Sequence, residues 1–305
     1  MEFEITIPPD AEGYTGRECP ECKKYFKIKF GTGLPDQVPC HCPYCNHIGP
    51  QNEFWTEQQL EYARSIVLNN VTGKMLSQLR TMERKPDPNA LFSIGITVKG
   101  SPTPIAYYAE KDLEQRTTCN SCTLQYAIFG TFAFCPDCGT HNSLQILEAN
   151  FGIIEKMLDL AETLESSLGK KLIESALENA VSAFDGFGRE TCSRLDSRIS
   201  FQNLVAANDK ILRLTGKGLL SAIGDDDWSF ILVQFQKRHL IAHKMGVIDA
   251  EYVKKTEASE SEIGRSISIS REDVARSTGI LSQMAGFLYR VAQDHTTDPE
   301  KQDLP

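Results

Sequence analysis

Apolar residues recur at helical spacing throughout the C-terminal half of the chain. Residues 170–187 place an apolar side chain at every third or fourth position, which predicts a helix with one buried face. The members of this face are Leu172, Ile173, Ala176, Leu177, Ala180, Val181 and Phe184. Residues 199–214 and 228–243 have the same period, and Asp227 is the expected N-cap of the second segment, which should end near Gly246. We therefore expect residues 169–295 to form an all-α bundle of four or five helices.

Helical periodicity also extends to both sides of these segments. Residues 143–168 predict a connecting helix ahead of the bundle. A last helix should begin with capping chemistry at Ser270 and Asp273. The side chains of this helix that should point inward are Val274, Leu281, Met284, Leu288 and Val291. Residues 296–305 are expected to form a flexible tail.

The N-terminal half has shorter and more varied patterns. Residues 55–85 predict a helix, which opens with a capping box of Thr56 and Gln59 and ends before Pro86. Residues 91–100 alternate like a strand, so we interpret 55–114 as a helix–strand spacer. The spacer separates two cysteine-rich segments, 1–54 and 115–142.

Lysines alternate with Phe26, Ile28 and Phe30 in the segment KYFKIKF, residues 24–30. Such a strand could present basic and aromatic groups to a nucleic-acid backbone. It could equally be a solvated hairpin edge, where lysines discourage pairing with other strands. The acidic net charge of the chain, −9, favours the hairpin edge.

Eight of the ten cysteines form four Cys-x-x-Cys pairs. The first two pairs are separated by nineteen residues and the last two by twelve, intervals that suit a short hairpin. Four thiolates complete a tetrahedral zinc shell without an open position, which is typical of a structural site. Both groups look like zinc ribbons, so two structural Zn²⁺ ions are expected. The predicted ligands are Cys19, Cys22, Cys42 and Cys45, then Cys119, Cys122, Cys135 and Cys138.

The other cysteines have weaker assignments. Cys40 and His41 directly precede Cys42, and either could replace a thiolate as a zinc ligand. Cys192 is unpaired in the sequence and is interpreted as an ordinary thiol. A redox function is disfavoured because the βαβ pattern of such proteins is missing.

Composition is that of a soluble globular protein, with 41% hydrophobic and 24% charged residues among 305. No run of eighteen apolar residues occurs, and the N-terminus lacks the apolar region of an export signal. We therefore expect a cytoplasmic protein without membrane contact, in which ten cysteines argue for metal rather than disulfides.

Several basic and titratable side chains lie close together at the end of a predicted helix, in residues 234–249, QFQKRHLIAHKMGVID. Arg238 is followed directly by His239 and, after three more residues, by His243. Basic residues in a last helical turn interact favourably with the helix dipole, which alone accounts for such a cluster. Histidine titrates near neutral pH and arginine binds phosphate through two N–H groups, so the same residues suit phosphodiester chemistry.

This segment resembles the HEPN family (higher eukaryotes and prokaryotes nucleotide-binding domain). The resemblance rests on Arg-x4-His with a polar residue after the arginine, on the downstream HxxGVIDxxYxKKT, and on its place in an all-α region. It covers residues 150–295, roughly half of the chain. The expected fold class is thus multidomain, with two small β-rich zinc ribbons of four cysteines each, followed by a HEPN-like helical bundle.

The resemblance implies a metal-independent endoribonuclease with a composite site formed by a homodimer. His243 would be the acid or base, Arg238 the phosphate clamp, and His239 would orient the scissile group or His243. Lys237 and Lys244 could draw RNA in, since no acidic residue lies within 237–247.

The ribbons would recognise a target or a partner, such as an inhibitor protein, in a toxin–antitoxin or antiviral role. The alternative is a non-catalytic module that binds RNA, nucleotide or protein. A DNA-binding regulator is disfavoured because the chain lacks a helix-turn-helix signal and a basic charge.

Overall fold

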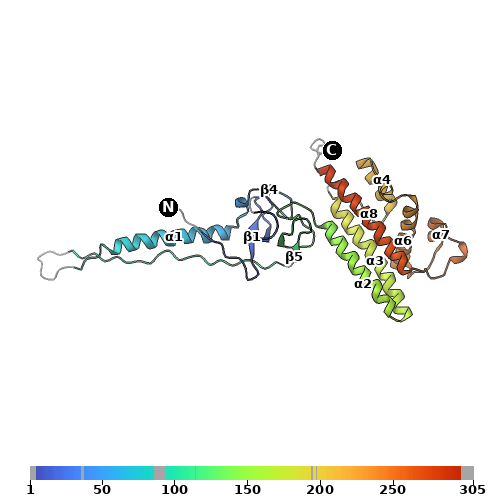
Figure 1. Ribbon diagram of the computed structural model, residues 1–305, viewed down its shortest axis with the longest axis horizontal. Helices are drawn as coiled ribbons and strands as arrows, with labels where there is room; N and C mark the ends of the chain where they lie inside the picture. Colours follow the sequence, from blue (N-terminus) through green and yellow to red (C-terminus); the bar gives the residue numbers. More distant parts are fainter. Residues whose placement is uncertain are drawn as a thin grey trace. The chain divides into compact units, whose positions relative to one another are not determined.

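The chain divides into two compact units, Met1–His141 and Asn142–Pro305, in a computed structural model. The structure describes residues 5–35, 38–85, 94–113, 115–193, 195–196 and 198–296. The first unit is built on a small sheet with one long helix, and the second is helical (Figure 1). No described helix has the length and apolar character that a membrane span requires.

The two cysteine-rich segments share one antiparallel sheet. Its strands are β1 (Tyr14–Glu18), β2 (Tyr25–Lys29), β5 (Gln115–Thr118) and β6 (Gln125–Ile128), in the order β1-β2-β6-β5. The strands β2 and β6 pair through Lys27 with Ala127 and Ile28 with Tyr126. A separate two-stranded sheet pairs β3 (Cys40–His41) with β4 (Ile48–Gly49). The two ribbons, predicted as separate units, are therefore joined by strand pairing.

Strand β2 is central and not an edge, which contradicts the favoured interpretation of residues 24–30. It lies between β1 and β6, and Phe26, Lys27 and Ile28 are all buried. Lys27 is only 3% exposed because its ammonium group pairs with the Asp10 carboxylate at 2.8 Å. Lys29 lies over the ring of Tyr14, with 5.5 Å from Nζ to the ring centre. The lysine alternation thus reflects internal pairing as much as solvent exposure.

A helix and an extended segment form an arm of the first unit. After η1 (Gln51–Phe54), α1 (Glu57–Arg80) begins with the predicted capping box, in which the Gln59 N–H donates to Thr56 Oγ1 at 3.1 Å. Residues 94–113 run back along α1 (Figure 1). Of the strand predicted over 91–100, residues 91–93 lie outside the described residues. Residues 94–100 form only an isolated bridge, from Ile96 to Arg84.

Both ends of the arm meet strand β1 at Gly16. The Gly16 N–H donates to a carboxylate oxygen of Glu110 at 2.7 Å, and the Gln59 amide donates to the Gly16 carbonyl at 2.9 Å. Glu110 also accepts from the hydroxyls of Tyr25 and Tyr108. Because buried polar groups need such partners, this cluster fixes where the arm leaves the sheet and where it returns.

The second unit is a bundle of long helices around one apolar core. Its core includes Phe184, Phe201, Leu204, Leu281 and Met284. The helices are α2 (Ser143–Thr163), α3 (Ser166–Thr191), α4 (Leu204–Thr215), α5 (Leu220–Ile223), α6 (Asp225–Lys244), α7 (Ala250–Thr256) and α8 (Arg271–Thr296), with the 3-10 turn η2 (Glu260–Glu262).

Helix α2, the predicted connector, belongs to this bundle. It packs on α3 and α8, and its residues Leu147, Ile154 and Leu158 lie in the core (Figure 1). The amphipathic period of residues 143–168 thus marks a face that the bundle itself covers.

Helix caps follow the predicted chemistry with one exception. Ser270 and Asp273 cap α8, since the Asp273 N–H donates to Ser270 Oγ at 3.1 Å. All five of the apolar side chains predicted to point inward on α8 are buried. The predicted N-cap of α6, Asp227, is wrong because the helix already starts at Asp225, after Gly224. Carboxylates in this first turn complement the positive end of the helix dipole. This favours a helix whose first turn includes Asp225, Asp226 and Asp227.

Candidate metal centres and candidate active site

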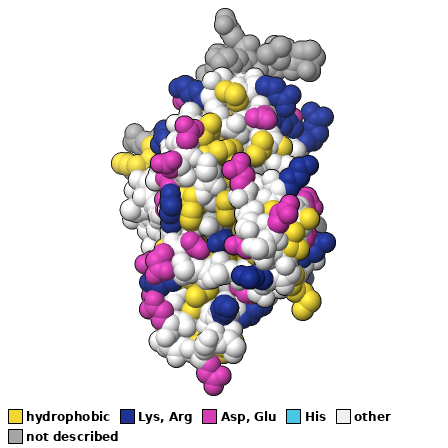
Figure 2. All heavy atoms as spheres, turned by 90° about the vertical axis from the view of Figure 1, so that its right-hand side faces the viewer, with side chains coloured by type: hydrophobic (Ala, Val, Ile, Leu, Met, Phe, Trp, Pro, Cys, Tyr) yellow, Lys and Arg dark blue, Asp and Glu magenta, His cyan; other side chains and the backbone are white. Residues whose placement is uncertain are grey.

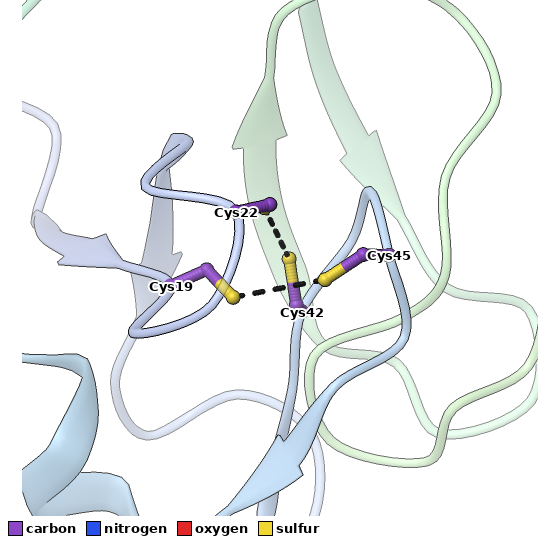
Figure 3. A group of neighbouring side chains, drawn as sticks. All are labelled: Cys19, Cys22, Cys42 and Cys45. Carbon is purple, nitrogen blue, oxygen red and sulfur yellow. Dashed lines mark hydrogen bonds between the residues drawn. The ribbon is translucent and has the colours of Figure 1, made fainter.

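The first four predicted ligands converge on one point. The Sγ atoms of Cys19 and Cys45 are 3.7 Å apart, and those of Cys22 and Cys42 are 3.6 Å apart (Figure 3). All four sulfurs lie within 4.8 Å of one another. A zinc–sulfur distance of about 2.3 Å gives a tetrahedron with edges of about 3.8 Å, so the spacing fits a tetrahedral metal ion.

The second group has the same geometry. The Sγ atoms of Cys119 and Cys138 are 3.7 Å apart, and those of Cys122 and Cys135 are 3.5 Å apart. All four again lie within 4.8 Å of one another. Each group can hold one ion with four sulfur ligands, an arrangement compatible with two zinc ribbons and typical of structural sites.

All four Cys-x-x-Cys turns share one backbone shape. The residue after each second cysteine has a positive φ: 57° at Lys23, 58° at Asn46, 65° at Thr123 and 67° at Gly139. Each of these residues donates its N–H to the carbonyl of the first cysteine of its pair, at 2.9–3.0 Å. The repeated turn aims two sulfurs at one point, so the short sequence Cys-x-x-Cys encodes half of each site.

Burial of the innermost sulfurs favours their neutral form. Loss of hydration raises the pKa of the Cys42 and Cys135 thiols well above the ordinary value. Four thiolates so close together would repel one another in a poorly hydrated site. A divalent cation offsets both effects, which is why metal binding to such a group is coupled to proton release and folding.

Gly139 is the one glycine among the four residues of positive φ. A Cβ atom added there would lie 2.7 Å from the His41 ring, on a backbone with φ of +67°. We expect Gly139→Ala to destabilise the first unit by about 1–3 kcal/mol, from the clash and the left-handed backbone. Lys23→Ala is the control because Lys23 has a similar φ and already carries a Cβ atom. Denaturant unfolding of the zinc-loaded variants measures both, and equal losses would contradict this explanation.

The alternative ligands Cys40 and His41 are not members of either group of four. The Cys40 thiol is buried, and burial raises its pKa to about 12. The His41 ring lies 3.1 Å from Asn46 Oδ1, and its backbone N–H donates to the Pro136 carbonyl at 2.7 Å. His41 thus holds the two ribbons together.

Cys192 lies in the core of the helical unit, as a buried structural thiol would. Burial raises the pKa of its thiol to about 12. Low exposure and a high pKa both suppress thiolate chemistry, in agreement with the prediction of an ordinary thiol.

The two predicted catalytic histidines lie side by side at the exposed end of α6. The ring centres of His239 and His243 are 4.7 Å apart, and both side chains are at least partly exposed. The helix ends one residue after His243, and Met245 then takes a φ of 53° and is 94% exposed. The two imidazoles are therefore open to solvent and to any molecule that docks there.

Arg238 lies apart from His243 on the helix. Five positions correspond to a rotation of about 140° around an α-helix, so one helix does not bring the two side chains together. The Nε atom of Arg238 is buried, and no described residue accepts a hydrogen bond from it. One turn earlier, the Oε1 atom of the buried Gln234 also has no partner within the described part of the chain.

Acidic residues surround this segment, contrary to the positive field expected from residues 237–247. Lys237 pairs with Asp273 at 3.2 Å, and Lys244 lies 4.0 Å from Asp249. Helix α7 adds Glu251, whose pKa is lowered chiefly by the Lys255 hydrogen bond and also by His239. Basic and acidic side chains are likewise interspersed on the face of the molecule in Figure 2.

Sequence reasoning did not connect these acids to the histidines. Asp249 N-caps α7 by accepting from the Tyr252 N–H at 2.9 Å, and Asp273 belongs to the cap of α8. Their capping positions were recognisable signals, but their approach to α6 depends on how the helices pack. No family model, curated protein or solved structure matched this chain.

Proposed function

We propose that the protein is a metal-independent endoribonuclease whose active site forms between two copies of the helical unit, with zinc-binding ribbons that hold a target or a partner. The observation that supports it is the solvent-accessible pair of imidazoles, His239 and His243, at the end of α6. Two histidines at contact distance can share the roles of acid and base at neutral pH.

The proposed reaction uses the ribose 2′-hydroxyl as the nucleophile. His243 accepts the 2′-hydroxyl proton while the 2′-oxygen attacks phosphorus. The bond from phosphorus to the 5′-oxygen breaks, and a protonated imidazole donates a proton to that leaving oxygen. Arg238 binds the non-bridging oxygens as negative charge develops on them. The products are a 2′,3′-cyclic phosphate and a free 5′-hydroxyl, so no cofactor is consumed.

A second copy of the chain would bring an Arg238 side chain to His243, which one helix alone keeps apart. A two-fold axis brings the same surface of each protomer together, so Arg238 of one copy can approach His243 of the other. Exposed apolar residues beside the histidines, Met245 and Val247, favour such a contact.

A non-catalytic binding module is the second candidate. It is favoured by the pairing of Lys237 with Asp273 and of Lys244 with Asp249, which neutralises the cations nearest the histidines. RNA binding would then depend on fewer free charges and would be weak at physiological salt.

An RNA cleavage assay tests the proposal. Zinc-loaded protein is incubated with mixed RNAs without added divalent ions, beside His243→Ala, Arg238→Ala and the same-helix control Gln236→Ala. We expect the first two variants to lose about 100-fold or more of the activity and the control to keep it. Product ends should carry cyclic phosphate, and sedimentation should show equal dimer content.

Equal RNA decay in all four samples would identify a contaminating nuclease and leave the binding module as the better account. Zinc content is measured in parallel, so that loss of metal is not mistaken for loss of catalysis.

A further inference from the structure

Helix α1 carries an apolar stripe on its exposed side, which continues just past the end of the helix. Leu68, Val71, Met75, Leu79 and Met82 follow at spacings of three and four residues, and all are exposed, up to 64% at Met82. Leu60 extends the stripe two turns toward the N-terminus. Spacings of this kind place side chains on one face of a helix, which is the pattern of a coiled-coil seam.

The remaining chain of the arm occupies a different side of the helix. Ser65, Asn69 and Thr72 bind the returning segment: Ser65 Oγ accepts from the Ala106 N–H at 2.9 Å, and the Asn69 amide donates to the Thr103 carbonyl at 2.7 Å. At 100° per residue, these positions point away from the centre of the stripe. No residue that the structure describes covers the stripe fully, since each of its members is at least 37% exposed.

We infer that this stripe pairs with the α1 stripe of a second copy of the chain, with the two helices antiparallel. Two polar residues, Arg64 and Gln78, interrupt the apolar face. Both are four positions from the ends of the stripe, Leu60 and Met82, so these two pairs of positions are symmetric about Val71. The other members are not, since Leu68, Met75 and Leu79 mirror onto Lys74, Val67 and Ala63. In an antiparallel pair centred on Val71, Arg64 therefore lies opposite Gln78, whose amide oxygen can accept from the guanidinium.

Charge along the arm favours the same direction. Two acidic residues, Glu57 and Glu61, lie at the start of α1. Its end carries Arg80, Arg84 and Lys85 with one acid, Glu83, among them, so this end has a net positive charge. An antiparallel pair places acidic ends against basic ends. A parallel pair would oppose Arg64 with Arg64 and each charged end with its own copy. The antiparallel arrangement also has two-fold symmetry, which closes the assembly at two chains through this surface.

This inference does not depend on the nuclease proposal, because it uses only residues of the first unit. It concerns a surface distinct from the one around His243, so each can fail without the other.

Photocrosslinking in the full-length, zinc-loaded protein tests both the contact and its direction. p-Benzoylphenylalanine replaces Val71 in one sample and Arg64 in another, and labelled chains are mixed with unlabelled chains so that intermolecular products are identified by mass. We expect the probe at 71 to capture the region around Val71 of the other copy and the probe at 64 to capture the region around Gln78. Capture of position 64 by 64, or capture only outside α1, would overturn the inference.

Affinity gives an independent measurement. Met75→Asp places a charge within the stripe, one turn from Val71, and should raise the dissociation constant of the α1 contact by about 30-fold or more. Asn70→Asp is the matched control, because Asn70 is exposed on the same helix but off the stripe. The yield of the intermolecular crosslink from the probe at 71, measured in both variants as a function of chain concentration with helicity and zinc content checked, reports the loss. Equal association of both variants would also overturn the inference.

Discussion

Removal of zinc is expected to unfold Met1–His141 while the helical unit stays folded. The first unit buries few large apolar side chains apart from those around the cysteine groups, such as Phe26, Phe54 and Tyr126. Binding of a structural zinc ion contributes on the order of 10 kcal/mol to folding, which is comparable with the whole stability of a small domain. The helical unit has its own core and none of the eight cysteines, so it should stay folded when a chelator removes the metal.

The two tryptophans allow this difference to be measured. Trp55 stacks on the buried Arg17 of the first unit, with 4.7 Å from the guanidinium to the ring, whereas Trp228 packs in the helical unit. In a Trp228→Phe chain, fluorescence reports on Trp55, and far-ultraviolet circular dichroism reports mainly on the bundle. Chelator should change the fluorescence and leave most of the helical signal, and zinc should restore the fluorescence.

Matched cysteine variants separate ligand loss from general damage. Cys42→Ser should lower the zinc content from two ions per chain to one, whereas Cys40→Ser should keep both, since Cys40 is not among the four sulfurs. Fluorescence of Trp55 that does not respond to complete metal removal would contradict the role of zinc in folding.

Asp185→Ala is expected to destabilise the helical unit by about 2–4 kcal/mol. Asp185 is buried in α3 and accepts from the backbone N–H of Phe201 at 2.7 Å. It also accepts from Gln202 at 3.2 Å and from Arg189 at 3.1 Å. Its loss leaves the N–H of Phe201 buried without a partner, at the point where the chain turns from α3 toward α4.

The control for this variant is Glu174→Ala in the same helix. Glu174 pairs with the exposed Lys171 at 2.9 Å, and such surface pairs contribute less than about 1 kcal/mol. Thermal unfolding of the bundle compares the two, with Trp228 as the reporter. Similar losses in both variants would mean that Asp185 is no more than a surface charge.

Local chemistry explains what the sequence could predict. The two groups of four cysteines were predictable because the two sulfurs of each pair are held by one short turn, whose shape depends on neighbouring residues alone. The capping box at Thr56 and the cap at Ser270 are short-range in the same way. The buried faces of α3 and α8 were predictable because their apolar period extends over many turns.

Long-range pairing explains what it could not predict. Strands β2 and β6 are separated by about a hundred residues, and no local pattern says that Ile28 pairs with Tyr126. The Asp10 that neutralises Lys27 lies in a preceding loop, so the lysines of β2 appeared solvent-exposed. Likewise Asp273 reaches Lys237 only because α8 packs on α6. The histidine pair was visible in the sequence, but its acidic surroundings were not.

The hydrogen bonds at Gly16 mean that the chain leaves the sheet to form the arm and returns to the sheet at the same place. Gln59 and Glu110 contact the two backbone groups of one residue, so the departure and return points are neighbours although about fifty positions separate them. The strand pairing that unites the ribbons does not pass through the arm. The length and surface residues of the arm can therefore change without disturbing the sheet and the two cysteine groups, as with an inserted segment in a surface loop.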